Sequence, residues 1–141
     1  MSFQIEMVED PAPCFALRYA VFVEEQGIPV DLEQDELDAV AVHLLARDGA
    51  HPIGAARVVF EDDFAKIGRL CVLAQARGTG LGAALVRHAV TVAQAQEGTT
   101  KVKLGAQVPA IRFYEKLGFR AVGPVYLDAG LDHRDMVMEL T

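Results

Sequence analysis

A predicted strand becomes a predicted helix within Leu70-Cys71-Val72-Leu73-Ala74-Gln75-Ala76-Arg77-Gly78-Thr79-Gly80-Leu81-Gly82. Three glycines stand at alternate positions directly after Arg77. The first N–H groups of a helix have no intrahelical partner and carry a partial positive charge, and glycine lets a phosphate oxygen approach them closely. The stretch therefore predicts an anion-binding turn. A tight turn with close helix packing would explain the same glycines and stays an alternative.

The residues around this stretch predict a sheet. Apolar runs at 39–46 and 53–60 flank Asp48-Gly49, a dipeptide typical of two-residue hairpin turns. A third strand at 65–73 continues the meander. After the helix, which we expect to end at Gly98, residues 101–106 alternate charged and apolar side chains. The segment from 65 to 106 is thus a strand-helix-strand unit, whose two strands should be parallel.

Together with the elements predicted near both ends of the chain, this unit gives an α/β (α+β) architecture with a mixed central sheet and flanking helices. No internal repeat or linker interrupts the sequence, so we expect a single domain over residues 1–141. The remaining predicted elements are a strand at 3–8, a helix from Pro11 to Gly27, an acidic loop, a second helix at 109–118, and a closing hairpin of 119–127 and 135–140 across a loop at 128–134.

Composition excludes several classes of function. The net charge of −7 argues against nucleic acid, whose binding depends on clustered Lys and Arg. No apolar run approaches the ~20 residues that span a membrane, and the first residues lack the pattern of a secretory signal. We therefore expect a cytoplasmic protein with no membrane or nucleic-acid partner. Cys14 and Cys71 have no metal-ligand spacing, so no metal is expected.

The acidic residues gather in one segment. Residues 19–46 contain seven Asp and Glu but no Lys or Arg, whereas the rest of the chain has 13 acidic and 13 basic residues. One interpretation is a solvated helix end and loop. The other is an acidic surface that guides a cationic substrate, such as an amine, to the site.

A dinucleotide-binding fingerprint is a rival explanation of the glycine turn, because Gly78-x-Gly80-x-x-Ala83 fits its relaxed form. The fingerprint requires an acidic residue about twenty positions later, and residues 99–103 contain none. Coenzyme A fits better. The anion-binding turn suits its pyrophosphate, and the amides of its pantetheine arm can pair with an exposed strand edge.

Two motifs resemble the GNAT superfamily of N-acetyltransferases. Gln75 to Gly80 matches its acetyl-CoA motif Q/R-x-x-G-x-G/A. Residues 107–119, Gln-Val-Pro-Ala-Ile-Arg-Phe-Tyr-Glu-Lys-Leu-Gly-Phe, are similar to its N-x-x-A-I-x-x-Y-E-K-L-G-F helix, with Gln107 replacing the usual Asn. Over nearly its whole length the chain also resembles the ElaA/YjcF-like branch, although Gly130-Leu131-Asp132-His133 departs from that branch's G-I-P-H.

This resemblance implies a GNAT-like fold in which two parallel strands splay apart to admit pantetheine. It implies acetyl transfer from acetyl-CoA to a small-molecule or peptide amine, by direct attack in a ternary complex. Whether the protein forms a homodimer is left undecided by the resemblance. The residues implied for cofactor binding are Leu70, Cys71, Val72, Arg77, Gly78, Thr79, Gly80, Leu81, Gly82 and Gln107, and Tyr114 is implied as the catalytic residue near the sulfur.

Proton transfer explains why a tyrosine and a base are both needed. A Tyr hydroxyl (reference pKa ~10) can donate to a departing thiolate whose thiol has a pKa of ~8.5, although the transfer is uphill by about 1.5 units. The attacking amine must lose a proton, and Glu25, Asp35, His43 and His133 are the candidate acceptors. Arg57 and Arg69 are candidates for ion pairs or for an acceptor carboxylate. A non-catalytic acyl-CoA-binding module stays the alternative function.

Overall fold

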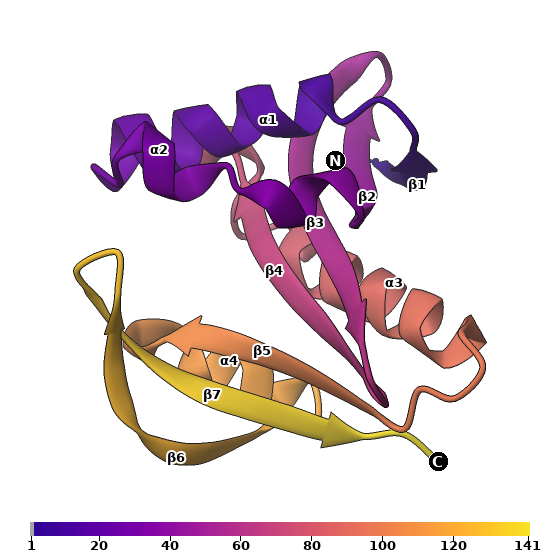
Figure 1. Ribbon diagram of the computed structural model, residues 1–141. Coiled ribbons are helices and arrows are strands. Elements are labelled where there is room, and N and C mark those ends of the chain that lie inside the picture. Colours follow the sequence, from indigo (N-terminus) through magenta and orange to yellow (C-terminus); the bar gives the residue numbers. More distant parts are fainter. Residues whose placement is uncertain (1) are drawn as a thin grey trace.

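The computed structural model describes residues 2–141, which form a seven-stranded mixed sheet with helices on both faces (Figure 1). The strand order is β1-β2-β3-β4-β5-β7-β6. All neighbours are antiparallel except β4 and β5. The strands are β1 (Gln4–Val8), β2 (Val42–Asp48), β3 (His51–Glu61), β4 (Phe64–Val72), β5 (Lys101–Gln107), β6 (Arg120–Asp128) and β7 (Leu131–Glu139).

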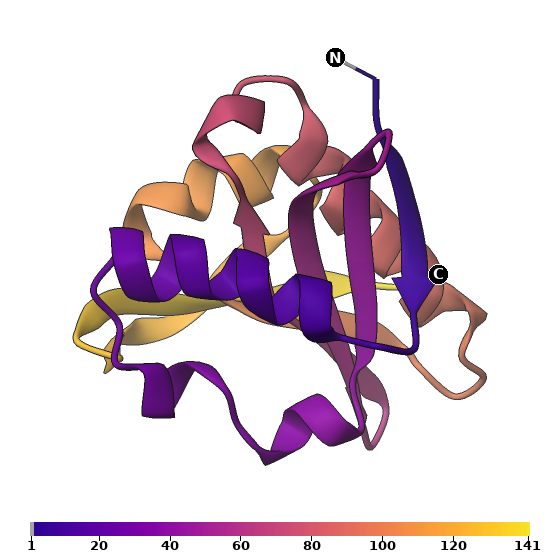
Figure 2. The same ribbon diagram turned by 90° about the horizontal axis from the view of Figure 1, so that it is seen from above.

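Helices α1 (Ala12–Arg18) and α3 (Leu81–Ala95) lie on opposite sides of the strands (Figure 2). Because successive side chains of a strand point to opposite faces, β2 serves both layers. Leu44 belongs to the apolar cluster under α3, and Leu45 to the cluster under α1. The shorter helices are α2 (Val30–Glu33) and α4 (Ile111–Lys116).

The hairpins β2–β3, β3–β4 and β6–β7 each have a two-residue turn. The hairpin predicted at Asp48-Gly49 is confirmed, but its turn residues are Gly49 and Ala50, because Asp48 still pairs with His51; Gly49 has a φ of +61°. The loop predicted at 128–134 is wrong, since β6 and β7 are paired up to Asp128 and Leu131. The turn between them has two positive φ angles, +51° at Ala129 and +79° at Gly130, as a primed hairpin turn requires.

The predicted helix from Pro11 to Gly27 is confirmed in extent but changes geometry. After α1 it continues as a π-helix over Tyr19–Glu25. The predicted acidic loop also contains α2 and a 3₁₀ turn at Glu36–Ala39, which Asp35 caps through a hydrogen bond from the N–H of Leu37. Local pattern did not reveal these elements, because their geometry depends on contacts with distant residues.

The parallel strands β4 and β5 separate part-way along their length. Their pairing runs from Phe64–Lys101 to Ile67–Leu104 and then stops. Immediately after this point, a bulge on β4 places Arg69 at a φ of +52°. The predicted splay of parallel strands is therefore present, and Figure 1 shows the two strands diverging.

Among residues 2–141, no helix has both the length and the apolar character that crossing a membrane requires. In the same part of the chain, no three His, Cys, Asp or Glu side chains gather as a metal site would need.

Candidate active site

A cleft of about 390 Å³ opens where β4 and β5 separate. Gly68 to Leu70 form one wall and Leu104 to Gln107 contribute to the other. Side chains from the π-helix, from α4 and from the β6–β7 hairpin complete it. The cleft thus draws on segments from both ends of the chain, which the sheet order brings to one place.

The loop that follows β4 presents a row of free N–H groups. Gly78 and Gly80 have φ angles of +78° and +86°, and Gly80 is the N-cap of α3. Within residues 2–141, the backbone N–H groups from Gly78 to Ala83 donate to no acceptor. Six unpaired donors at the positive end of a 15-residue helix can bind an anion such as a pyrophosphate.

The residues predicted to bind the cofactor fall into two groups. Leu70 and Gln107 line the cleft. Cys71 and Val72 lie at the end of β4, and the others form the loop and first helical turn beyond it. The side chains of Cys71 and Leu81 are almost fully buried, so only their backbone can meet a ligand. Burial also raises the pKa of the Cys71 thiol to about 12, which makes it an unreactive thiol.

Arg77 already has protein partners. Its guanidinium donates to the carboxylate of Glu25 at 2.7 Å and to the carbonyl of Val72 at 3.0 Å. The hydrogen bond from Arg77 lowers the pKa of Glu25. The neighbouring residue Gln26 accepts a hydrogen bond from Gln107 at 3.0 Å. The end of the first helical segment therefore contacts two residues that were predicted to bind the cofactor.

Tyr114 lies in α4 and lines the cleft. Its ring makes edge contacts with Phe113 and Phe119, with centroids 4.9 and 6.1 Å away. Within residues 2–141, its hydroxyl has no hydrogen-bond partner, which leaves it free for a ligand in the cleft. Burial raises the pKa of Tyr114 to about 12, so the side chain keeps its proton and acts as a donor.

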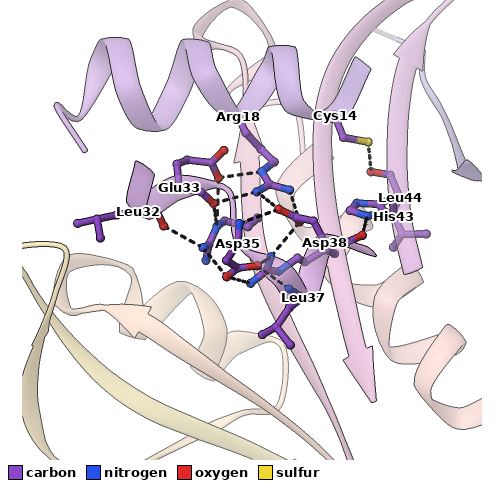
Figure 3. A network of polar contacts seen from close by, with 11 residues as sticks. Cys14, Arg18, Leu32, Glu33, Asp35, Leu37, Asp38, His43 and Leu44 are labelled. Atoms are coloured by element: carbon purple, nitrogen blue, oxygen red, sulfur yellow. Dashed lines mark hydrogen bonds and ion pairs between the residues drawn. The ribbon is translucent and has the colours of Figure 1, made fainter. Parts of the chain in front are cut away.

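A buried network of ion pairs borders the other side of the cleft (Figure 3). Arg18 from α1 donates to Glu33 at 2.8 Å and to Asp38 at 2.8 Å. Arg57 from β3 donates to Asp35 at 2.7 Å and to Asp38 at 2.9 Å. Arg69 from the bulge of β4 donates to Glu33 and Asp35.

This network overturns both interpretations of the acidic segment for Glu33, Asp35 and Asp38. They are neither a solvated surface nor an attractive field, because three arginines from outside the segment neutralise them. Burial alone would raise the pKa of Asp38, but hydrogen bonds from Arg18 and Arg57 outweigh it and hold the pKa well below its usual range. The segment is thereby fixed against β3 and β4.

Comparison with known proteins agrees with this geometry. The family model described as "Acetyltransferase (GNAT) domain" matches residues 16–140. The chain belongs to the GNAT acetyltransferase family. The resemblance found in the two sequence motifs is thus confirmed, together with the fold class and with membership of a family of enzymes that transfer acetyl groups.

The relatives of this GNAT chain include members of the ElaA/YjcF-like branch that its sequence resembles. YjcF of Bacillus subtilis, an uncharacterized N-acetyltransferase, is 37% identical over 89% of each chain. The crystal structure of Escherichia coli ElaA has a TM-score of 0.85 at 29% identity and covers 98% of this chain and 99% of its own. An acyl-CoA N-acyltransferase from Pseudomonas aeruginosa has a TM-score of 0.85 at 31% identity, with 97% and 98% covered.

A more distant GNAT structure shares the fold. This acetyltransferase, from Elizabethkingia anophelis, was solved with acetyl-CoA bound and has a TM-score of 0.76 at 18% identity, with 98% of each chain covered.

The four candidate bases of this GNAT domain lie in different places. Glu25 pairs with Arg77, and Asp35 pairs with Arg57 and Arg69. His43 is buried beside the carbonyl of Asp38, and within residues 2–141 its Nδ1 has no partner. Of the four, His133 is the one that lines the cleft.

The sequence interpretation missed Tyr126, a second tyrosine in the cleft. Its hydroxyl lies so close to Gly105 that a Cβ there would be 2.5 Å away. A glycine within a predicted strand often marks such a close approach. Gly105 was therefore the available signal, although it does not say which side chain approaches.

Proposed function

We propose that the protein transfers the acetyl group of acetyl-CoA to a primary amine by direct attack in a ternary complex. The observation that carries this proposal is the separation of β4 and β5 after Ile67 and Leu104. The cleft that it opens lies beside the strand that leads to the free N–H groups of Gly78 to Ala83. One continuous path thus offers donors for a pyrophosphate and an unpaired strand edge for the pantetheine amides.

The substrate's thioester supplies an activated acyl group, and the protein has to orient it. In the proposal, residues 68–72 and Gln107 contact the pantetheine arm, while the turn from Arg77 to Gly82 binds the pyrophosphate. Arg77 would exchange Glu25 for the pyrophosphate, whose two phosphates together carry more negative charge than one carboxylate. Glu25 is therefore a competitor at this site and a weak candidate for the base.

His133 is the base in this proposal because of its tautomer. Its Nδ1 lies 2.8 Å from the carbonyl oxygen of Leu131. A carbonyl can only accept, so in the neutral ring Nδ1 carries the proton and Nε2 keeps the lone pair. Nε2 takes one proton from the protonated form of the acceptor amine. The neutral nitrogen then forms a bond to the acyl carbon, and the second proton that it loses passes to solvent water. As the C–S bond breaks, the hydroxyl of Tyr114 donates a hydrogen bond to the leaving sulfur.

Two measurements test the proposal. Acetyl-CoA should raise the melting temperature by mass action, whereas NAD should not, because no acidic residue is placed for a ribose. A panel of primary amines should then release free thiol from acetyl-CoA. Stabilisation by NAD and none by acetyl-CoA would overturn the cofactor assignment. Binding of acetyl-CoA without thiol release from any amine would instead support a non-catalytic acyl-CoA-binding role.

A further inference from the structure

The hairpin of β6 and β7 carries a polar group at the point where the cleft begins. Tyr126 and His133 are directly opposite each other in the two strands, and their rings stack with centroids 5.9 Å apart. The hydroxyl of Tyr126 donates to the carboxylate of Asp135 at 2.7 Å. Tyr126 and His133 line the cleft. Since Asp135 is two residues from His133, all three share one face of the sheet.

The absence of a side chain at position 105 gives the Tyr126 hydroxyl its place. Gly105 is opposite Asp135 in β5, and it is the first residue of β5 beyond the last pair with β4. A Cβ at this position would be 2.5 Å from the hydroxyl oxygen and 3.9 Å from a carboxylate oxygen of Asp135. The hydroxyl is therefore held at the point where β4 and β5 begin to separate.

Two carboxylates near this hydroxyl, Asp135 and Asp128, favour a cation. Asp135 and Asp128 form no ion pair with any residue in 2–141. The intervening Arg134 points to the other face of β7 and donates to the carbonyl of Gly123 at 2.7 Å. Burial and the hydrogen bond to Asp135 raise the pKa of Tyr126 well above its usual range, so the hydroxyl keeps its proton. With that proton directed at Asp135, its lone pairs can accept a hydrogen bond.

We propose that the Tyr126 hydroxyl, held by Asp135 above Gly105, binds the protonated amine of the acceptor. This inference rests on the proposed acetyl transfer and names the class of acceptor: an alkylammonium group with no carboxylate on the neighbouring carbon. The ammonium donates one N–H to Tyr126 and lies in the field of Asp135 and Asp128. A carboxylate beside the amine, as in a free α-amino acid, would meet these two acids and be repelled.

The same position explains how the amine becomes a nucleophile. His133 is beside Tyr126, so the ammonium can pass one proton to Nε2 of His133 while another N–H stays bonded to Tyr126. The amine is then neutral and oriented. Tyr126 touches the substrate but takes no proton from it, which assigns binding and orientation to Tyr126 and proton transfer to His133.

Binding of n-butylamine at neutral pH, where it is protonated, tests the inference without depending on turnover. Nuclear magnetic resonance titrations follow the Tyr126 ring and the Gly105 amide, with and without CoA. The wild type should show saturable shifts. Tyr126→Phe, followed at the Gly105 amide, should bind n-butylamine about tenfold to a hundredfold more weakly, the effect of losing a hydrogen bond to a charged group.

Gly105→Ala is an independent variant, because its methyl group displaces the Tyr126 hydroxyl without removing it. It should weaken n-butylamine to a similar extent. Tyr19→Phe is the matched control, since Tyr19 is an exposed tyrosine outside the cleft, and it should leave binding unchanged. Asp132→Asn is the control for Asp135→Asn, which should also weaken binding. Glycine, at the same concentrations, should cause no saturable shift.

Three results would overturn the inference: no saturable binding of n-butylamine to the wild type, unchanged binding in Tyr126→Phe, or equal binding of glycine. CoA affinity is measured in every variant and should not change. A wild type that binds n-butylamine at Tyr126 but does not bind CoA would contradict the proposed acetyl transfer and leave the amine site standing.

Discussion

Arg18 and Asp38 form a bidentate ion pair in the interior of the protein. Nη1 of Arg18 is 2.8 Å from one carboxylate oxygen, and Nη2 is 3.1 Å from the other. The two side chains are only 1% and 8% exposed. Asp38 also accepts from Arg57 on β3. One carboxylate thus joins the first helix, the acidic segment and the central sheet.

Replacing Asp38 with Asn should therefore destabilise the fold strongly. The variant keeps the shape of the side chain but leaves Arg18 and Arg57 with less compensation for their buried charges. Breaking a buried pair in this way costs about 3–5 kcal/mol of unfolding free energy. Urea denaturation measures the change. Glu36→Gln, in the same segment but exposed, is the control and should change stability little. Equal effects of the two substitutions would contradict the role of the network.

The pH dependence of stability follows from the same residue. Because the pKa of Asp38 is lower in the folded protein than in the unfolded chain, its contribution is complete above the ordinary Asp pKa of ~3.9. It is lost as the pH falls from there towards the folded-state pKa. The wild type should lose unfolding free energy more steeply than Asp38→Asn between pH 5 and about 2. Parallel curves over this range would exclude Asp38 as the cause.

The sequence predicted the elements that local residues determine. The hairpin signal of Asp48-Gly49 and the glycines before α3 act within a few residues of themselves, so the hairpin and the glycine turn were both found, the hairpin turn being displaced by one residue to Gly49 and Ala50. The ion-pair network was not predicted, because Arg57 and Arg69 lie 19 to 36 residues from their acidic partners. Only the sheet brings them together. A segment with no basic residue of its own therefore seemed uncompensated.

The candidate site divides in the same way. Tyr114 and the glycine turn belong to contiguous motifs and were predicted as site residues. Their roles in binding and catalysis stay predictions. Tyr126 belongs to no motif. Its position depends on the pairing of β6 with β7 and on the space above Gly105, neither of which is a property of its own neighbours in the sequence.

Gly80→Val should weaken acetyl-CoA binding more than it destabilises the fold. Gly80 has a φ of +86°, which costs a non-glycine residue about 1–2 kcal/mol. A Cβ there would meet no protein atom within 4 Å, so the protein can still fold, but the new side chain would occupy space beside the free N–H groups. Calorimetry and urea unfolding are measured together. Gly49→Val is the matched control, because Gly49 also has positive φ and free space but lies in a distant turn. Normal affinity in a folded Gly80→Val would place the pyrophosphate elsewhere.

His133→Gln should lower kcat by about 10²- to 10⁴-fold, the usual contribution of a general base. The variant should keep its affinity for acetyl-CoA, because the glutamine removes only the proton acceptor. His51→Gln, an exposed histidine outside the cleft, is the control and should leave kcat unchanged. Wild-type kcat in His133→Gln would assign the base to another group.

Tyr114→Phe should keep acetyl-CoA affinity and lose turnover, because it removes only the hydroxyl from a residue that lines the cleft. Burial raises the pKa of Tyr114 to about 12. Full proton transfer to a thiolate whose thiol has a pKa of ~8.5 is then uphill by about 3.5 units, so the hydroxyl assists mainly as a hydrogen-bond donor. We expect kcat to fall about tenfold to a hundredfold, the low end for acid assistance. Single-turnover kinetics measure the chemical step directly.

An acyl donor with a more acidic thiol leaving group should partly rescue the variant, because its departure needs less assistance. Wild-type single-turnover rates in Tyr114→Phe would assign protonation of the thiolate to water, whereas loss of acetyl-CoA binding would indicate that the hydroxyl has a structural role.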